Sequence, residues 1–592
     1  MLTQRRFTLL LFSILLQSAV LAQNNTIPSS PTNYSKEVEE RIRQVEQDAL
    51  FVKFAVKGQK LTTLQDQMAA FNVNGLSIAV INDYKVEWAK GYGWANVQEK
   101  KQVTPATLFE PGSISKSLNA LGVMKLVQDK KLDLQTDINR YLKSWHFPYD
   151  TTSHGKKITI ANLLSHTAGL TVHGFPGYYY GDSFPTIPQI LDGKPPANTS
   201  AVRSMFEPGL RYEYSGGGTM ISELIQMDIT GKPYDKHIEQ TVFKPLRMYN
   251  SFFTQPPPPG KKKLLATAYG GDGKPIKGNY PILIEQAAGG LWTTPSDLAK
   301  FIIEIQLSAQ GRSNKVLNKE ITQLMLTPYV DKSAALGVFI DTINGTRYFK
   351  HDASNQGFSG LYYASLEEGK GIAVFINSDA GFAVVPQLLT AVTNVYNWKG
   401  FATKAKPIVK ETVELTPAMA DKYDGVYRDP NGLLIVVTQK DGLLWYRAGG
   451  GFSWKMYFTS ADAFINLESL SEKQFYTSPD GKVTGFSRSL DGKELAKAEK
   501  LTILQLPDST QQQYAGTYTA EDGNNGEVIV KDKALWLTVE GEQKKVYFIS
   551  TTQFYIAEDA GVDYSVHIGK DGKVTGISGK QRGQEIIYKK TK

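Results

Sequence analysis

The spacing of hydrophobic and polar residues divides the chain into a mixed region and a strand-rich region. A helical period runs over 37–70, and apolar runs at 75–81 and 85–93 flank the turn sequence NDY, which predicts a β-hairpin. Helices and loops follow, and strand-like runs return over 335–376. Together these features predict a mixed α/β domain over residues 37–403.

One helix start is marked clearly by the sequence TTPSDLAKFIIEIQ. Thr294 has the side chain of an N-cap, Pro295 occupies the first helical position, and Asp297 lies in the first turn. We therefore expect a helix to begin at Pro295.

The strand-rich region contains an internal repeat. Residues 404–420 are predicted to be a linker, and beyond them four segments recur at an offset of 90–91 residues. The matched pairs are YDGVY with YAGTY, LLWY with ALWL, KMYFTSADAF with KVYFISTTQF, and DGKVTGFS with DGKVTGIS. Their Asp-Gly turns and strand-rich pattern predict two small antiparallel sheets or barrels, over 421–503 and 510–592.

The first 22 residues have the pattern of a secretory signal peptide. Two arginines precede an apolar run, and Val20 and Ala22 occupy the small-residue positions of a cleavage site. A retained membrane anchor is the alternative, but the run is short for a bilayer span. We expect removal of residues 1–22, a disordered leader over 23–36, no permanent membrane span, and a periplasmic or secreted protein of the bacterial envelope.

Composition further limits the kinds of site that the chain can contain. The chain has 592 residues, a formal net charge of +8 and no cysteine. The lack of cysteine excludes disulfides, cysteine nucleophiles and cysteinyl-zinc sites, and the seven histidines show no metal-binding spacing. No block of lysine or arginine is long enough to indicate nucleic-acid binding. We expect no metal, no cofactor and no nucleic-acid partner, and the oligomeric state stays open.

Ser113 and Lys116 in FEPGSISKS are the leading candidates for chemistry. A serine hydroxyl needs a base to remove its proton, and residues three apart on a helix share a face. If a helix begins near Ser113, Lys116 can be that base, and free N–H groups at the helix start can hold an oxyanion. The alternative is an ordinary N-cap serine with a surface lysine. The same spacing recurs at Ser153 and Lys156, in a predicted loop.

Further motifs occur in a familiar order along the chain. NGLSIAVINDYKVEWAKGYGWAN, FEPGSISKS, YEYSGGGTMISELI and FKHDASNQGFSG together resemble the serine β-lactamase and penicillin-binding-protein superfamily, specifically its class C β-lactamase, esterase and D-aminopeptidase branch. ITIANLLSHTAGL and AAGGLWTTPSDLAKF are similar to scaffold segments of that family. The resemblance covers roughly residues 60–400 and implies an α/β (α+β) fold in which helices flank an antiparallel sheet.

By this resemblance, Ser113 is the acylated nucleophile and Lys116 is its partner base. Tyr214 would relay protons to the leaving group and from water, which calls for a phenol pKa lowered by Lys116. Tyr212 is the competing candidate, and a core position is the alternative for Tyr214. The motif favours Tyr214 because Ser215 and a run of glycines follow it.

The resemblance also implies a substrate side to the pocket. His351 would line it, and the backbone N–H groups of Ser113 and Ser354 would form the oxyanion hole. Gly216 stands where the family often has asparagine, His351 stands where most penicillin-recognising enzymes have lysine, and Ala353 replaces a glycine. These departures argue against an efficient β-lactamase or D-Ala-D-Ala carboxypeptidase. A structural strand histidine is the alternative for His351.

The sequence therefore predicts a secreted serine hydrolase that forms an acyl-enzyme with small esters, amides or short peptides, including peptides with D-residues. The alternatives are a weak β-lactamase, a DD-peptidase, a sensor of β-lactams or muropeptides that is acylated without turnover, and a scaffold whose barrels bind ligand. The C-terminal repeats resemble the lipocalin-like β-domains of D-aminopeptidases. That likeness implies that a loop from 420–592 caps the site.

Overall fold

The computed structural model describes residues 34–591, apart from short internal stretches. The predicted signal peptide, residues 1–22, lies outside the described residues, as does most of the predicted leader over 23–36. Within the described part of the chain, no helix has both the length and the apolar character needed to cross a membrane. The internal stretches that are not described are residues 49–53, 59–62, 402–406, 431, 441, 449–452, 468, 470, 521–524, 540–541, 557–561 and 582–583.

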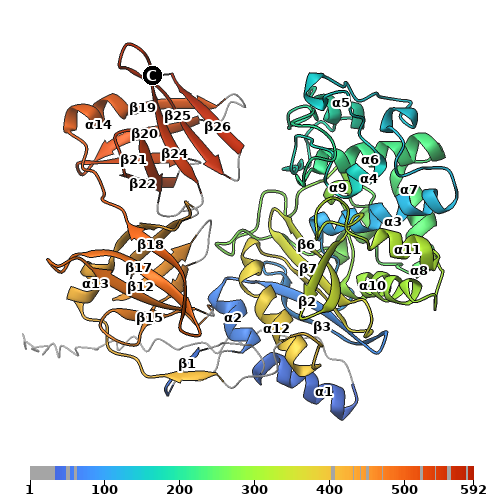
Figure 1. The fold of residues 1–592 in the computed structure, drawn as a ribbon, viewed down its shortest axis with the longest axis horizontal. Coiled ribbons are helices and arrows are strands. Elements are labelled where there is room, and N and C mark those ends of the chain that lie inside the picture. The colour runs from blue at the N-terminus through green and yellow to red at the C-terminus, as the bar shows by residue number, and fades with distance from the viewer. Residues whose placement is uncertain are drawn as a thin grey trace, which may run out of the picture.

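A seven-stranded antiparallel sheet forms the centre of the first unit, which we call the α/β unit (Figure 1). Its strand order is β4-β3-β2-β8-β7-β6-β5, so β2 from the start of the unit pairs with β8 from its end. The predicted hairpin is confirmed, since β2 and β3 pair around a turn in which Asp83 and Tyr84 have positive φ. The strands are β2 (Gly75–Asn82), β3 (Lys85–Asn96), β4 (Lys101–Gln102), β5 (Phe339–Ile343), β6 (Thr346–Asn355), β7 (Phe358–Ser365) and β8 (Gly371–Ile376).

Helices cover both faces of this sheet. Along β2, Leu76, Ile78 and Val80 enter a hydrophobic cluster with α1 and α12, and the intervening Ala79 and Ile81 enter a larger cluster with α3, α6 and α10. This alternation confirms the expected α+β architecture of an antiparallel sheet between helices. The helices are α1 (Lys36–Arg43), α2 (Leu64–Ala70), α3 (Ser115–Gln128), α4 (Ile160–Leu164), α5 (Ile187–Asp192), α6 (Gly216–Thr230), α7 (Tyr234–Ile238), α8 (Lys244–Leu246), α9 (Gln286–Gly289), α10 (Pro295–Ala309), α11 (Lys319–Met325) and α12 (Val385–Val395).

The predicted start of α10 is confirmed in detail. The Thr294 side chain accepts the backbone N–H of Asp297, and Pro295 is the first helical residue. The Asp297 carboxylate accepts in turn from the backbone N–H of Asn250 and from Lys300 Nζ, each at 2.7 Å. This capped end fixes where α10 begins to pack across β2 and β8.

The single helix predicted over 37–70 is wrong. The structure divides this segment into α1, a π-helical turn at Gln44–Asp48, the strand β1 (Phe54–Val56) and α2. β1 pairs in parallel with β9 (Ile408–Lys410), which lies far along the chain. A local helical period cannot show such a pairing, because the partner strand supplies the backbone hydrogen bonds and lies outside any local window.

Residues 404–420, predicted as a linker, contain regular structure where the structure describes them. β9 is one element, and the helix α13 (Pro417–Tyr423) begins after a cap in which the Thr416 side chain accepts the N–H of Met419. The segment therefore pairs with the α/β unit at one end and joins the next unit at the other.

Two all-β units follow, which confirms the predicted pair of antiparallel sheets. β-unit 1 runs from α13 to β18 and has the strand order β13-β12-β11-β10-β18-β17-β16-β15-β14, whereas β-unit 2 runs from α14 to β26 and closes into a barrel. Their elements after α13 are β10 (Gly425–Arg428), β11 (Leu434–Lys440), β12 (Leu443–Ala448), β13 (Ser453–Lys455), β14 (Tyr457–Phe458), β15 (Ala463–Ile465), β16 (Glu472–Thr477), β17 (Val483–Leu490), β18 (Lys493–Lys500), α14 (Asp508–Tyr514), β19 (Gly516–Ala520), β20 (Asn525–Lys531), β21 (Ala534–Val539), β22 (Glu542–Phe548), β23 (Gln553–Ile556), β24 (Asp563–Ile568), β25 (Val574–Gln581) and β26 (Gln584–Lys590).

The two β-units repeat one another down to single hydrogen bonds. The Tyr427 hydroxyl donates to the carbonyl oxygen of Tyr423 at 2.7 Å, and the matching Tyr518 hydroxyl donates to that of Tyr514 at 2.6 Å. In both units the accepting tyrosine ends the short helix that precedes the first strand. The repeat in the sequence is therefore a repeat of one structural unit.

Candidate active site

Ser113 lies at the entrance to α3. It belongs to the 3-10 turn η2 (Gly112–Ile114), directly before the helix, and its side chain is half-exposed. Gly112 has a φ of 50°, and a Cβ at this position would lie 2.9 Å from the carbonyl oxygen of Ser354. Glycine therefore lets the turn that carries Ser113 lie directly against β6.

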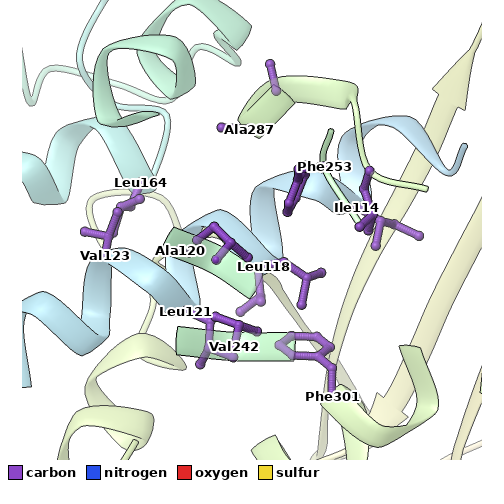
Figure 2. Close-up of a cluster of buried hydrophobic side chains, with 14 of the residues drawn as sticks. Ile114, Leu118, Ala120, Leu121, Val123, Leu164, Val242, Phe253, Ala287 and Phe301 are labelled. Carbon is purple, nitrogen blue, oxygen red and sulfur yellow. The ribbon is translucent and has the colours of Figure 1, made fainter. Parts of the chain in front are cut away.

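α3 is buried on nearly every side. Leu118 packs in a cluster that includes Val242 and Phe301 from neighbouring elements (Figure 2). Its buried polar groups have partners, as when the Ser117 hydroxyl donates to the carbonyl oxygen of Gly337 at 2.9 Å. A helix held this closely has little freedom to move the side chains at its first turn.

Lys116 faces Ser113 from the first turn of α3. Its Nζ lies 3.3 Å from the Ser113 Oγ and donates to the carbonyl oxygen of Ala288 at 2.7 Å. The lysine is 5% exposed, and burial lowers its pKa from 10.5 to about 7. A lysine with this pKa is neutral in a large share of molecules near pH 7, which a general base requires.

Tyr214 lies beside the same lysine. The Lys116 Nζ is 4.9 Å from the centroid of the Tyr214 ring. Burial raises the pKa of the Tyr214 phenol, and a hydrogen bond with the Ser113 side chain offsets only part of the rise. The expected lowering of this pKa is therefore wrong, because loss of water disfavours the phenolate more than its neighbours stabilise it. Tyr212 packs edge-on against Phe339 instead, so Tyr214 is the tyrosine at the Ser113–Lys116 pair.

His166 is a neighbour of the site that the sequence does not single out. Its ring centroid lies 4.2 Å from that of Tyr214, and its Nδ1 accepts the backbone N–H of Ser215 at 3.2 Å. Burial and the nearby charge of Lys116 hold the pKa of His166 well below its usual value. The segment ITIANLLSHTAGL indicates scaffold, and only the folded chain shows that its histidine holds the Tyr214 ring.

His351 lies on β6 with 3% of its surface exposed. Its Nδ1 is 2.6 Å from the carbonyl oxygen of Asp352. Because a carbonyl oxygen only accepts, Nδ1 carries the proton in this contact and Nε2 remains an acceptor. Burial lowers the pKa of His351 to about 3, and the charges of Lys116 and Lys350 add to the effect. The imidazole is therefore neutral near pH 7.

Ser354 lies further along β6, on a part of the strand that β5 does not pair. The β5–β6 register ends at Lys350, and beyond it η2 approaches the open edge at Gly112. This arrangement brings the backbones of Ser113 and Ser354 close to one another, as two N–H donors to one oxyanion would need. Their part in an oxyanion hole stays a prediction.

Comparison with known proteins decides which family carries this arrangement. A family model described as Beta-lactamase matches residues 62–395, which is more than half of the chain. The chain belongs to the β-lactamase family of serine hydrolases. The match begins before the β2–β3 hairpin and ends with α12, so it covers nearly all of the α/β unit.

Curated relatives of this β-lactamase-family chain are distant. "Protein flp" of Staphylococcus aureus (strain MRSA252) is 24% identical over 359 residues, which cover 58% of this chain and 67% of that protein. A "Beta-lactamase" of Pseudomonas fluorescens is 30% identical over 241 residues, which cover 41% of this chain and 62% of that protein. The chain thus spans about two thirds of the length of these relatives.

Two solved structures have a partly similar chain path. The octameric penicillin-binding protein homologue from Pyrococcus abyssi is 20% identical with a TM-score of 0.46, and the match covers 81% of this chain and 97% of that one. The D-amino acid amidase from Ochrobactrum anthropi SV3 is 21% identical with a TM-score of 0.47, and the match covers 60% and 99% of the two chains.

Gly216, where the β-lactamase family often has asparagine, begins α6 close behind Tyr214. Its N–H donates to the carbonyl oxygen of His173 at 2.9 Å. A Cβ at this position would lie 2.9 Å from the same oxygen and 3.0 Å from the Phe175 ring, so a side chain here would displace that loop. Gly216 therefore contributes backbone to the wall of the site and no side-chain contact to a substrate.

A buried network joins three parts of the site. The Glu110 carboxyl accepts from Gln255 Nε2 at 2.9 Å and from Asn355 Nδ2 at 3.2 Å. The same two amide groups also donate to backbone carbonyls at the end of α9, at 3.0 and 3.2 Å. Because α9 also supplies the Ala288 carbonyl that binds Lys116, the network connects the turn that carries Ser113, the lysine and the end of β6.

Three carboxyl groups beneath the site are buried, those of Glu110, Glu223 and Glu285. Burial raises the pKa of Glu223 to about 8 and that of Glu285 to about 7, and it holds the pKa of Glu110 well above its usual value. The value for Glu223 favours its protonated acid near pH 7. Among the residues that the structure describes, no three histidine or acidic side chains gather as metal ligands would.

Proposed function

We propose that this chain is a hydrolase of the bacterial envelope in which Ser113 forms an acyl-enzyme with small esters, amides or short peptides, including peptides with D-residues. The observation that carries the proposal is the 3.3 Å contact between the Lys116 Nζ and the Ser113 Oγ. The lowered pKa of Lys116, about 7, supports it because a neutral amine at that distance can take the serine proton.

Acylation then uses groups that are already in contact. Neutral Lys116 accepts the Ser113 proton as the Oγ attacks the substrate carbonyl carbon, and the carbonyl electron pair moves to its oxygen. The backbone N–H groups of Ser113 and Ser354 would hold that oxyanion. When the carbonyl re-forms, the leaving group departs with a proton that passes from the Lys116 ammonium.

Tyr214 fits the role of a proton relay in its neutral form. Its raised pKa keeps the phenol protonated, so the hydroxyl can donate to the leaving group while it receives a proton from Lys116. In deacylation the same path runs in reverse, and a water molecule loses its proton through Tyr214 to Lys116 as it attacks the acyl carbon. Lys116, and not a tyrosinate, is the base of the resting site.

His351 bears on the class of substrate. A neutral imidazole with an acceptor at Nε2 provides no positive charge for a substrate carboxylate. It suits a substrate that presents an N–H or O–H donor, or a purely apolar group, at this position. This supports esters, amides and peptides over substrates that must be held by a carboxylate.

β-Lactam hydrolysis is the second candidate. The 30% identity with the Pseudomonas fluorescens β-lactamase favours it, although that match covers only 41% of this chain. The neutral His351 predicts that any such activity is slow. A sensor that is acylated without turnover is the remaining alternative, and only release of the acyl group separates it from an enzyme.

The test compares the wild type with Ser113→Ala, using p-nitrophenyl acetate, a penicillin and D-alanine p-nitroanilide. Ser153→Ala is the matched control, because Ser153 and Lys156 have the same spacing and Ser153 lies in a short 3-10 turn, Thr151–Ser153. Each protein is followed by product release and by intact mass. We expect sustained release by the wild type and Ser153→Ala, and a loss of about 1,000-fold or more in Ser113→Ala.

Two other results would change the assignment. A stable adduct on Ser113 without continued product release favours the sensor. Equal turnover by the wild type and Ser113→Ala, with no adduct at Ser113, would overturn the proposed nucleophile.

A further inference from the structure

A cavity of about 480 Å³ lies between the α/β unit and β-unit 1. Figure 1 shows β-unit 1 beside α2, and the cavity wall on that side includes Asn72, Gly271 and Asp379. The opposite wall is formed by strands β11, β12 and β13. None of the residues assigned above to the hydrolytic site lines this cavity among the described residues.

The β-unit wall carries one aromatic and two cationic side chains. Leu444 and Tyr446 of β12 point into the core of β-unit 1, so the alternating Trp445 and Arg447 point outward, and Lys440 at the end of β11 lies with them. Among the described lining residues, the two cations Lys440 and Arg447 face one carboxylate on the other wall, that of Asp379. The β-unit wall is therefore positively charged.

The internal repeat provides a comparison for this wall. In β-unit 2 the matching tryptophan, Trp536, donates its indole N–H to the carbonyl oxygen of Lys531 at 3.2 Å. The indole N–H of Trp445 is buried and finds no acceptor among the described residues. Thr538 stands in β-unit 2 where Arg447 stands in β-unit 1. The unpaired donor and the added charge thus occur in the copy that faces the α/β unit.

The opposite wall connects directly to the hydrolytic site. The Asp379 Oδ1 accepts the backbone N–H of Gly357 at 2.6 Å, and Gly357 lies in the turn between β6 and β7. That turn ends the strand on which His351 and Ser354 lie. The cavity is therefore next to the end of β6 that adjoins the candidate active site.

We propose that this cavity binds the carboxylate of a short peptide or amino acid. Lys440, Arg447 and the Trp445 indole N–H are donors that suit a carboxylate on the β-unit wall. The Asp379 carboxylate on the other wall is an acceptor that suits peptide N–H groups. A peptide end carries both kinds of group, so its polarity matches the two walls of the cavity.

The test measures peptide binding to the full-length Ser113→Ala protein by titration calorimetry, so its outcome does not depend on hydrolysis. The probe is Gly-Gly-Glu, and the comparison peptide is Gly-Gly-Gln amide, which has no carboxylate. We expect Gly-Gly-Glu to bind at least about tenfold more tightly than the amide, with a Kd that rises with salt.

Variants in the two β-units then locate the site. Arg447→Gln, Lys440→Gln and Trp445→Phe should each raise the Kd of Gly-Gly-Glu by about tenfold, since each removes a donor to the carboxylate. Lys531→Gln and Trp536→Phe change the matching positions in β-unit 2 and should leave it unchanged. Equal binding of the two peptides, equal effects in both β-units, or no binding of Gly-Gly-Glu up to about 10 mM would overturn the proposal.

Discussion

At the scale of single residues, burial shifts the groups of the candidate active site toward their uncharged forms. It lowers the pKa of Lys116 to about 7 and that of His351 to about 3, and it raises the pKa of Tyr214. Each shift favours the uncharged form of its group. The proposed proton transfer along Ser113, Lys116 and Tyr214 therefore starts from the neutral form of Lys116, which suits attack on an uncharged ester or amide.

The pH dependence of hydrolysis follows from Lys116. The base must be neutral, so kcat/KM for p-nitrophenyl acetate should rise with pH and level off above the lysine pKa of about 7. Lys116→Ala should lower kcat by about 100-fold or more and remove this inflection. The measurement is a pH–rate profile of each protein.

Lys125 provides the control for that experiment. It lies on the same helix and pairs with the Asp129 carboxylate at a partly exposed position. Lys125→Ala should keep both the rate and the inflection. A profile that is flat around neutral pH in the wild type, or one that Lys116→Ala leaves unchanged, would exclude Lys116 as the base.

At the scale of elements, the site depends on how η2, α9 and β6 are held against one another. Glu110 precedes η2, Asn355 ends β6, and both connect to one another and to α9 through Gln255 and backbone carbonyls. η2 has three residues and α9 has four, so neither is long enough to hold its place against β6 by its own packing, and we infer that this network positions both.

Glu110→Gln tests the network with little change in shape. Both partners of the Glu110 carboxyl are amide N–H donors, so a glutamine places its own N–H group against one of them. We expect a loss of about 1–3 kcal/mol in the free energy of unfolding of the α/β unit, together with a lower kcat. Urea denaturation and steady-state kinetics measure the two effects.

Glu99→Gln is the control, because Glu99 lies in an exposed turn. It should leave stability and kcat unchanged. Unchanged stability and kcat in Glu110→Gln would show that the three elements are held by packing alone.

The elements also show which features a sequence can predict. The β2–β3 hairpin, the cap at Thr294 and the pair Ser113–Lys116 are encoded within a few residues, so local patterns reveal them. The β1–β9 pair joins distant segments, and no local window contains both strands.

The same reason explains what the sequence misses in the site. His166 reaches Tyr214 across the fold, and the Glu110–Asn355 contact joins residues 245 positions apart. The direction of the Tyr214 pKa shift depends on burial, which a motif does not report.

At the scale of the whole molecule, β1 links the α/β unit to β-unit 1. It pairs with β9, and Phe54 is buried in a cluster with Ile465 and Leu467 of β-unit 1. The segments that enter and leave the α/β unit therefore meet at one place. The β1–β9 pair and the Phe54 cluster therefore hold the two walls of the cavity between the α/β unit and β-unit 1 close together.

Phe54→Ala should loosen β-unit 1 from the α/β unit. Truncation of a buried phenylalanine costs about 3–5 kcal/mol. The contact between the two units is small, so a loss of this size should separate them. We expect limited proteolysis between the units to become at least about tenfold faster, with the hydrolysis of p-nitrophenyl acetate retained.

Val409→Ala is the control, since Val409 of β9 is 62% exposed. It should be cleaved at the wild-type rate. Wild-type cleavage of Phe54→Ala would show that β1 does not hold the units together.

The buried lysine also lowers the stability of the fold near neutral pH. In the unfolded chain Lys116 has the ordinary lysine pKa of 10.5, so between pH 7 and pH 10.5 the unfolded state binds more protons than the folded state. The free energy of unfolding therefore increases as pH rises from 7 to 10.5, and it decreases as pH falls back toward 7. The difference amounts to about 5 kcal/mol.

Lys116→Met removes the buried amine and its cost in stability, and it keeps a side chain of similar length. The variant should unfold at a higher temperature than the wild type at pH 7, and the gap between the two should shrink as pH approaches 10, as measured by calorimetry. The residue proposed to activate Ser113 is then also the one without which the fold would be more stable.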